Sequence, residues 1–155
     1  MKKLVKILAL SLVFVFCFAF VACGGSSYSK IETALGKADF KVNQNAENVL
    51  SSIKTELNKS DLAVEFHVLT REEDSSGTTD FSHVIVLEFN ATDDLVEACK
   101  ESSVLKAIVK DAVASEDLKE AYDKLVQEGW ANGNCLVYGY TSSVRSEVKK
   151  IVKNA

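Results

Sequence analysis

The chain begins with an apolar segment that limits which residues are available to fold. Three lysines lead into sixteen apolar or small residues, 7–22. A transmembrane helix needs about 20 such residues, whereas a cleaved signal sequence has a basic start and a shorter apolar run. The motif Cys23-Gly24-Gly25-Ser26-Ser27 follows, and glycine and serine form flexible tethers. The sequence therefore predicts a signal peptide at 1–22, a tether at 23–30 and a single folded domain at 31–155.

The residues at the end of this segment, Phe20-Val21-Ala22-Cys23, resemble the lipobox of bacterial lipoproteins. Phe20 stands where that family usually has Leu, and it is also apolar. The Cys-Gly-Gly-Ser start is similar to that of small lipoproteins of Gram-positive bacteria, many of which carry uncharacterised α+β domains. The resemblance implies cleavage after Ala22 and attachment of a diacylglycerol to the sulfur of Cys23. Two or three acyl chains, at about 0.8 kcal/mol per buried CH2, hold a protein on a membrane almost permanently.

The resemblance thus implies a lipid-anchored protein of the cell membrane that faces outside the cytoplasm. The residues alone leave two alternatives open, an N-terminal anchor that is not cleaved and ordinary secretion with Cys23 left free. The expected partners are the lipid bilayer, through the acyl anchor, and a protein or small ligand in the cell envelope.

The charge of the folded part argues against nucleic acid as a partner. The signal segment holds three of the 18 basic side chains and none of the 22 acidic ones. Residues 23–155 therefore carry 15 basic and 22 acidic side chains, a net charge of −7. An acidic domain is repelled by phosphate backbones. Its 133 residues suffice for one domain with its own core.

In the first half of the domain the hydrophobic period changes from helical to strand-like. A helix is expected at 43–59, because its apolar residues recur every three to four positions: Ala46, Val49, Leu50, Ile53 and Leu57. Residues 62–68 alternate and predict a strand with one buried face. Residues 84–89 predict a second strand, and the polar stretch Arg71–Ser82 is interpreted as a long loop between them.

The pairing of these two strands decides which side chains meet. If the loop closes symmetrically about Gly77, His67 lies opposite Leu87. A site that pairs His67 with Glu65 or Glu88 requires a different register, because the register decides which side chains are neighbours across the hairpin.

The second half alternates between helical and strand-like patterns. Helical periodicity continues over 92–113, with a weak point at residues 101–103 that predicts two segments or one bent helix. Another helix is expected to end at Gly129, the segment Leu136–Tyr140 predicts a strand, and a last helix follows Thr141. Residues 31–35 suit a short helix, and 38–42 suit a weak edge strand.

Together these patterns predict an α+β domain of order (β)αββααβα. The expected sheet is small, mostly antiparallel, three- to four-stranded and packed with helices. If residues 38–42 pair with the sheet, the first six elements become the split βαββαβ arrangement of ferredoxin-like folds.

The cysteines allow few roles. The resemblance implies that Cys17 is removed with the signal segment and that Cys23 is the lipid site, which leaves Cys99 and Cys135 in the domain. Outside the cytoplasm these two can form a disulfide, or they can be separate buried thiols. The spacing of Cys and His fits no zinc site.

No catalytic motif emerges, and neither a cofactor nor a metal site is predicted. His67 is the only acceptable general base for an enzyme. The acidic cluster Asp93, Asp94 and Glu97 is explained by the positive first turn of a helix. Weak candidates for ligand binding are Trp130, Tyr138 and Tyr140, which either line a groove or close the edge of the core.

The last predicted helix carries four cations, Arg145, Lys149, Lys150 and Lys153, and one acid, Glu147. Such a helix either lies against anionic headgroups or is an ordinary surface helix whose cations complement its C-terminal dipole.

The favoured function is a membrane-anchored, non-enzymatic binding or interaction module. The alternatives are a small envelope hydrolase that uses His67 and an accessory component of an envelope complex.

Overall fold

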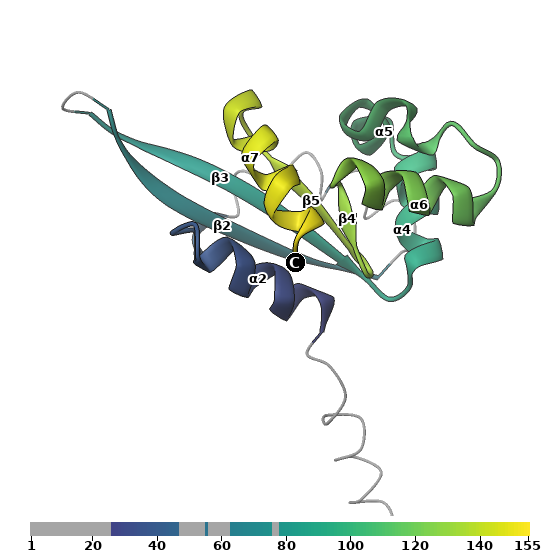
Figure 1. Ribbon diagram of the computed structural model, residues 1–155, viewed down its shortest axis with the longest axis horizontal. Helices are drawn as coiled ribbons and strands as arrows, with labels where there is room; N and C mark the ends of the chain where they lie inside the picture. The colour runs from purple at the N-terminus through teal and green to yellow at the C-terminus, as the bar shows by residue number, and fades with distance from the viewer. Residues whose placement is uncertain (1–25, 47–54, 56–62, 76–77) are drawn as a thin grey trace, which may run out of the picture.

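The computed structural model describes residues 26–46, 55, 63–75 and 78–155. Within them lie an antiparallel open sheet of five strands, ordered β1-β2-β3-β5-β4, and five α-helices (Figure 1). The elements in chain order are α2 (Ser27–Gly36), β1 (Lys41–Val42), β2 (Val64–Ser75), β3 (Thr78–Phe89), α4 (Thr92–Glu101), α5 (Ser103–Val109), the 3-10 helix η2 (Lys110–Val113), α6 (Leu118–Glu128), β4 (Ala131–Asn132), β5 (Cys135–Gly139) and α7 (Ser142–Lys153). None of the helices in these ranges is both long and apolar enough to cross a membrane.

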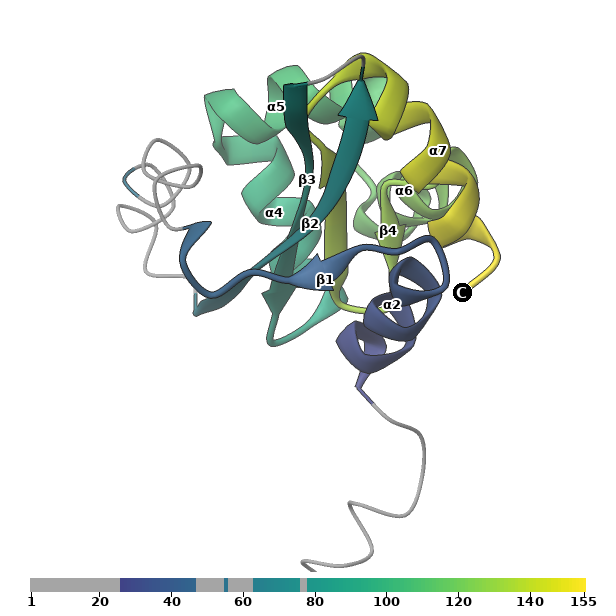
Figure 2. The ribbon, with the colours of Figure 1, turned by 90° about the vertical axis from the view of Figure 1, so that its left-hand side faces the viewer.

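Helices cover both faces of the sheet. Figure 2 shows α4 and α5 on one side of the β2–β3 hairpin and α2 and α7 on the other. The α2/α7 face packs apolar residues of the two helices on alternate residues of the strands: Ile31, Leu35, Leu69, Val84, Val86, Cys135, Val137, Val144, Val148 and Val152. The opposite face packs against α4, α5, η2 and α6 through residues that include Ile85, Leu87, Phe89, Leu95, Leu105, Leu125 and Leu136.

The β2–β3 hairpin is longer than the sequence predicts. Its ladder runs from Val64 opposite Phe89 to Ser75 opposite Thr78, so the predicted loop Arg71–Ser82 is wrong. The pairing is symmetric about the point between positions 76 and 77, and His67 lies opposite Val86. The predicted register was centred on Gly77 and is therefore wrong by one residue, a shift that changes every cross-strand neighbour.

The other strand predictions are partly confirmed. The fold is α+β with an antiparallel sheet, but the described residues hold five strands rather than three or four. The weak edge strand exists as β1, and β4 pairs with β5 around a turn at Gly133 and Asn134. The ferredoxin-like arrangement is wrong, because β1 pairs directly with β2, whereas the split arrangement inserts another strand between them.

Local signals explain where the helices begin and end. The weak point at 101–103 separates α4 from α5, and the Ser102 hydroxyl accepts a hydrogen bond from the Leu105 amide at the start of α5. Asp117 caps α6, and Gly129 ends it with a left-handed φ of 79°.

At the N-terminal end of the domain, Ser26 caps α2 and the helix begins at Ser27. The predicted tether at 23–30 is therefore too long, since residues 27–30 belong to α2. A serine at an N-cap stabilises such a helix start. The predicted signal peptide, Cys23 and most of the predicted helix at 43–59 lie outside the described residues.

Candidate functional site

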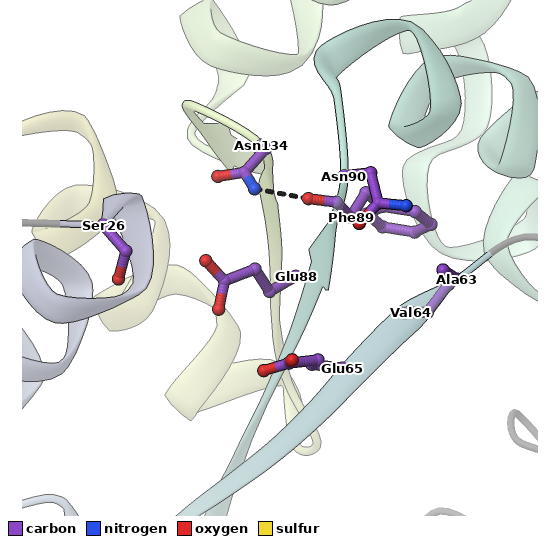
Figure 3. Close-up of a pocket in the computed structure, with 8 residues that line it drawn as sticks. All are labelled: Ser26, Ala63, Val64, Glu65, Glu88, Phe89, Asn90 and Asn134. Carbon is purple, nitrogen blue, oxygen red and sulfur yellow. Dashed lines mark hydrogen bonds between the residues drawn. The ribbon is translucent and has the colours of Figure 1, made fainter. Parts of the chain in front are cut away.

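A cleft of about 520 Å³ opens at one end of the sheet. The start of β2, the end of β3, the β4–β5 turn and the N-cap of α2 meet there. Its lining residues are Ser26, Ala63, Val64, Glu65, Glu88, Phe89, Asn90 and Asn134. In Figure 3 the side chains of Glu65, Glu88 and Ser26 point toward a common space, whereas the Phe89 ring points away from it.

Two carboxylates dominate the chemistry of this cleft. Glu65 on β2 lies directly opposite Glu88 on β3, and both side chains lie on the α2/α7 face of the sheet. Like charges at such a position repel and destabilise a sheet. The eight lining residues contain no lysine or arginine, and within the described part of the chain no Lys or Arg forms an ion pair with either carboxylate.

His67 stands beside both carboxylates, because residues 65 and 67 of one strand project from the same face. Its Nε2 lies 3.5 Å from Oε2 of Glu88 and 4.0 Å from Oε2 of Glu65. This nitrogen is buried and has no hydrogen-bond partner. The three side chains each offer a ligand atom, and these atoms all lie within 4.8 Å of one another. We call Glu65, His67 and Glu88 the Glu-His-Glu cluster.

The imidazole of His67 is held in place by α2. The Tyr28 ring stacks on it with centroids 3.6 Å apart and an interplanar angle of 15°. Burial, followed by the charges of Glu32 and Glu88, raises the pKa of the Tyr28 hydroxyl to about 12. Tyr28 is therefore a neutral partner, and it fixes the ring without adding a charge to the cluster.

The β4–β5 turn completes the rim and is fixed from several sides. Asn134 donates a side-chain hydrogen bond to the Phe89 carbonyl and accepts one from the Phe89 amide through its own carbonyl. The Tyr122 hydroxyl donates to the Gly133 carbonyl at 2.9 Å. A side chain at Gly133 would collide with Ser27, so this turn packs closely against the start of α2.

The weak candidates for ligand binding, Trp130, Tyr138 and Tyr140, do not line this cleft. The rings of Trp130 and Tyr138 stack 6.4 Å apart, with Lys149 3.9 Å from the Trp130 centroid and Arg145 4.7 Å from that of Tyr138. These two cations cover the rings, and Trp130 is buried, which favours the core-edge alternative. Tyr140 is exposed.

The same contacts bear on the basic face of α7. Two of its four cations, Arg145 and Lys149, have partners within the domain. Lys150 and Lys153 are exposed. This supports the interpretation of α7 as a surface helix packed on the domain.

Cys99 and Cys135 are both buried free thiols. They belong to the cores on opposite faces of the sheet, so the disulfide that the sequence left open is not formed. Burial raises the pKa of each thiol to about 12, with the charge of Glu88 adding to the effect at Cys135. Both therefore behave as small apolar residues.

The acidic residues Asp93 and Asp94 lie in the first turn of α4, as expected from the helix dipole. Within the described ranges, only the Glu-His-Glu cluster brings three metal-ligating side chains together. Sequence reasoning considered Glu65 and Glu88 as partners of His67 and set them aside because of the wrong register. It missed Tyr28 altogether, because nothing in the sequence relates α2 to β2.

The chain matches no protein-family model, no curated protein and no solved structure. Its function must therefore be argued from the cleft itself.

Proposed function

We propose that this chain is a lipid-anchored domain outside the cytoplasm that binds a small ligand in the cleft at the end of its sheet. The observation that carries the proposal is the position of Ser26, which lines the cleft and stands three residues after Cys23. An extended chain spans at most about 3.6 Å per residue, so the rim lies within about 11 Å of the Cys23 Cα atom. A lipid on Cys23 would hold the cleft next to the membrane surface.

The lining of the cleft favours a cationic or hydroxyl-rich ligand. Glu65 and Glu88 supply negative charge, while Asn90, Asn134 and Ser26 supply hydrogen-bonding groups. A volume of about 520 Å³ falls in the range of small-molecule sites. The net charge of −7 on residues 23–155 further favours the approach of cations.

The lipid anchor is tested with two matched cysteine variants. Cys23→Ala should abolish labelling with palmitate and release the protein from membranes in the producing bacterium. Cys17→Ala, which changes a cysteine of the apolar run, should leave both properties intact. Labelling and membrane retention of Cys23→Ala would refute the anchor.

The cleft is tested by photocrosslinking on intact cells. A photoreactive amino acid replaces exposed Asn90 at the cleft or, as a control, exposed Lys119 on α6. Crosslinks should form from position 90 and be lost when Glu88→Gln is added. Equal crosslinking from both positions would refute a ligand site in the cleft and would support the accessory role in an envelope complex.

The approach of His67 to Glu88, at 3.5 Å, favours an envelope hydrolase as the second candidate. An imidazole beside a carboxylate is the usual arrangement of a general base. Hydrolysis of p-nitrophenyl acetate by the purified protein, above the rate of a His67→Gln variant, would support this candidate. Equal rates for the two proteins would argue against it.

A further inference from the structure

We propose that the Glu-His-Glu cluster binds one divalent transition-metal ion, for which Zn²⁺ serves as the probe. This inference rests on the proposed binding role of the cleft and names its ligand class.

The donor set has the right chemistry for such an ion. Imidazole nitrogen suits zinc and its neighbours in the first transition series, and carboxylate oxygens suit harder divalent ions. Glu65 and Glu88 together carry two negative charges, which a divalent cation neutralises. A bound ion would therefore remove the repulsion between two carboxylates that face each other across the hairpin.

The distances leave room for an ion among the three side chains. Two ligand atoms that each lie about 2.1 Å from a tetrahedral ion are about 3.4 Å apart. The separation between Nε2 of His67 and Oε2 of Glu88 is 3.5 Å and needs almost no adjustment. The separation between Nε2 and Oε2 of Glu65 is 4.0 Å. Glu65 is 79% exposed and is free to close this gap.

Within the cluster, His67 is the residue whose surroundings most favour a bound ion. Its side chain is only 21% exposed, its Nε2 is buried without a hydrogen-bond partner, and its ring is already oriented by Tyr28. A buried polar atom without a partner is unfavourable, so such an atom calls for an explanation. A metal ion bound at Nε2 would give this nitrogen a partner and would lie next to both carboxylates.

The cluster supplies three protein ligands and leaves further positions open. Glu65 and Glu88 also line the cleft, so an open position would face Ser26, Asn90 and Asn134. Sites with three protein ligands and an open position bind exchangeable water or substrate, whereas structural zinc sites are closed by four protein ligands. The ion would thus be exposed to small molecules that enter the cleft.

The competing arrangement is a protonated His67 that forms ion pairs with the same carboxylates. It requires no metal, and a zinc titration separates the two. The full-length lipoprotein is purified in detergent, stripped with a chelator and titrated calorimetrically with ZnCl₂, and its thermal unfolding is followed with and without zinc.

The wild type should bind one Zn²⁺ per chain and unfold at a higher temperature in its presence. Glu88→Gln and His67→Gln should each weaken binding at least tenfold, because even residues that merely orient ligands contribute about 10- to 100-fold. The matched control is Glu97→Gln, an exposed acid on α4 that belongs to the acidic cluster considered above. It should bind zinc like the wild type.

Absence of zinc binding in the wild type, or unchanged binding in both Glu88→Gln and His67→Gln, would overturn the metal site. Circular dichroism of each variant without zinc checks that it is folded, and Glu65→Gln provides a third variant at an exposed position. Lipid anchoring does not involve zinc, and crosslinking from position 90 detects a small molecule in the cleft whether or not an ion is bound. Their persistence would leave the proposed function intact even if the metal inference failed.

Discussion

Arg71 connects three parts of the domain, and this makes its stability contribution a direct test of the structure. Its guanidinium donates to both carboxylate oxygens of Glu147 on α7, at 2.8 and 2.9 Å, and to Glu73 at 3.0 Å. It also donates to the Ala38 carbonyl and stacks over Phe40. The side chain thereby joins β2 to α7 and to the connection between α2 and β1.

The size of this contribution follows from geometry and exposure. Hydrogen bonds to charged groups contribute about 1.5–3 kcal/mol when buried, and exposed ion pairs about 0.2–1 kcal/mol. Glu147 is 39% exposed, so solvent screens the bidentate pair and its contribution falls between these ranges. Glu147→Gln should lower the free energy of unfolding by about 1 kcal/mol. For a domain of this size the melting temperature should fall by about 3–5 °C.

The assay is a double-mutant cycle measured by urea denaturation, with Arg71→Gln, Glu147→Gln and the double variant. The cycle isolates the coupling between the two side chains from their other contacts. Lys119 and Asp123 provide the control, because their N–O distance of 2.7 Å is similar while their side chains are 84% and 60% exposed. The exposed pair should show the weaker coupling. Equal coupling in the two cycles would refute the argument that burial, rather than distance, decides the strength.

Three further predictions concern backbone, charge and thiols. Gly129→Ala should destabilise the domain by more than about 1 kcal/mol, because φ is 79° and a Cβ would lie 2.3 Å from a backbone oxygen of α7. Gly36→Ala, which meets nothing within 4 Å, should be neutral or stabilising in the same thermal melts. Hydrogen bonds from Ser82 and then Arg71 lower the pKa of Glu73 in the folded state. The Glu73 carboxylate therefore stabilises the fold at pH values above its unfolded pKa, and this stabilisation is lost as the pH falls through its folded pKa. Between pH 5 and 3, the free energy of unfolding measured by urea titration should therefore fall less for Glu73→Gln than for the wild type. Both thiols of the domain should resist a thiol reagent at pH 8 and react only in urea, and rapid labelling of the native protein would contradict their burial.

Several local features of the fold follow from the sequence alone. The sequence predicts a break or bend at 101–103, the end of α6 at Gly129 and a strand at Leu136–Tyr140, which the structure places at Cys135–Gly139. Each depends on signals within a few residues, such as a capping side chain, a glycine or an alternating pattern. The α+β class follows from the same signals, because they fix the order of helices and strands.

The extent of the β2–β3 hairpin was decided by contacts between distant segments. The mostly polar residues 71–82 predict a loop. In the structure Arg71 binds Glu147, which is 76 residues away, and Glu73 accepts a hydrogen bond from Ser82. These partners satisfy the polar side chains within a strand, and no local pattern indicates them.

Sequence periodicity places His67 and both glutamates on neighbouring strands. Whether the three side chains meet depends on the register of those strands. Strand register has a period of two residues, so a shift of one residue separates His67 from Glu88 or brings them to 3.5 Å. The packing of Tyr28 on His67 depends in turn on how α2 lies across the sheet. The candidate site therefore arises from register and packing, which sequence periodicity leaves undetermined.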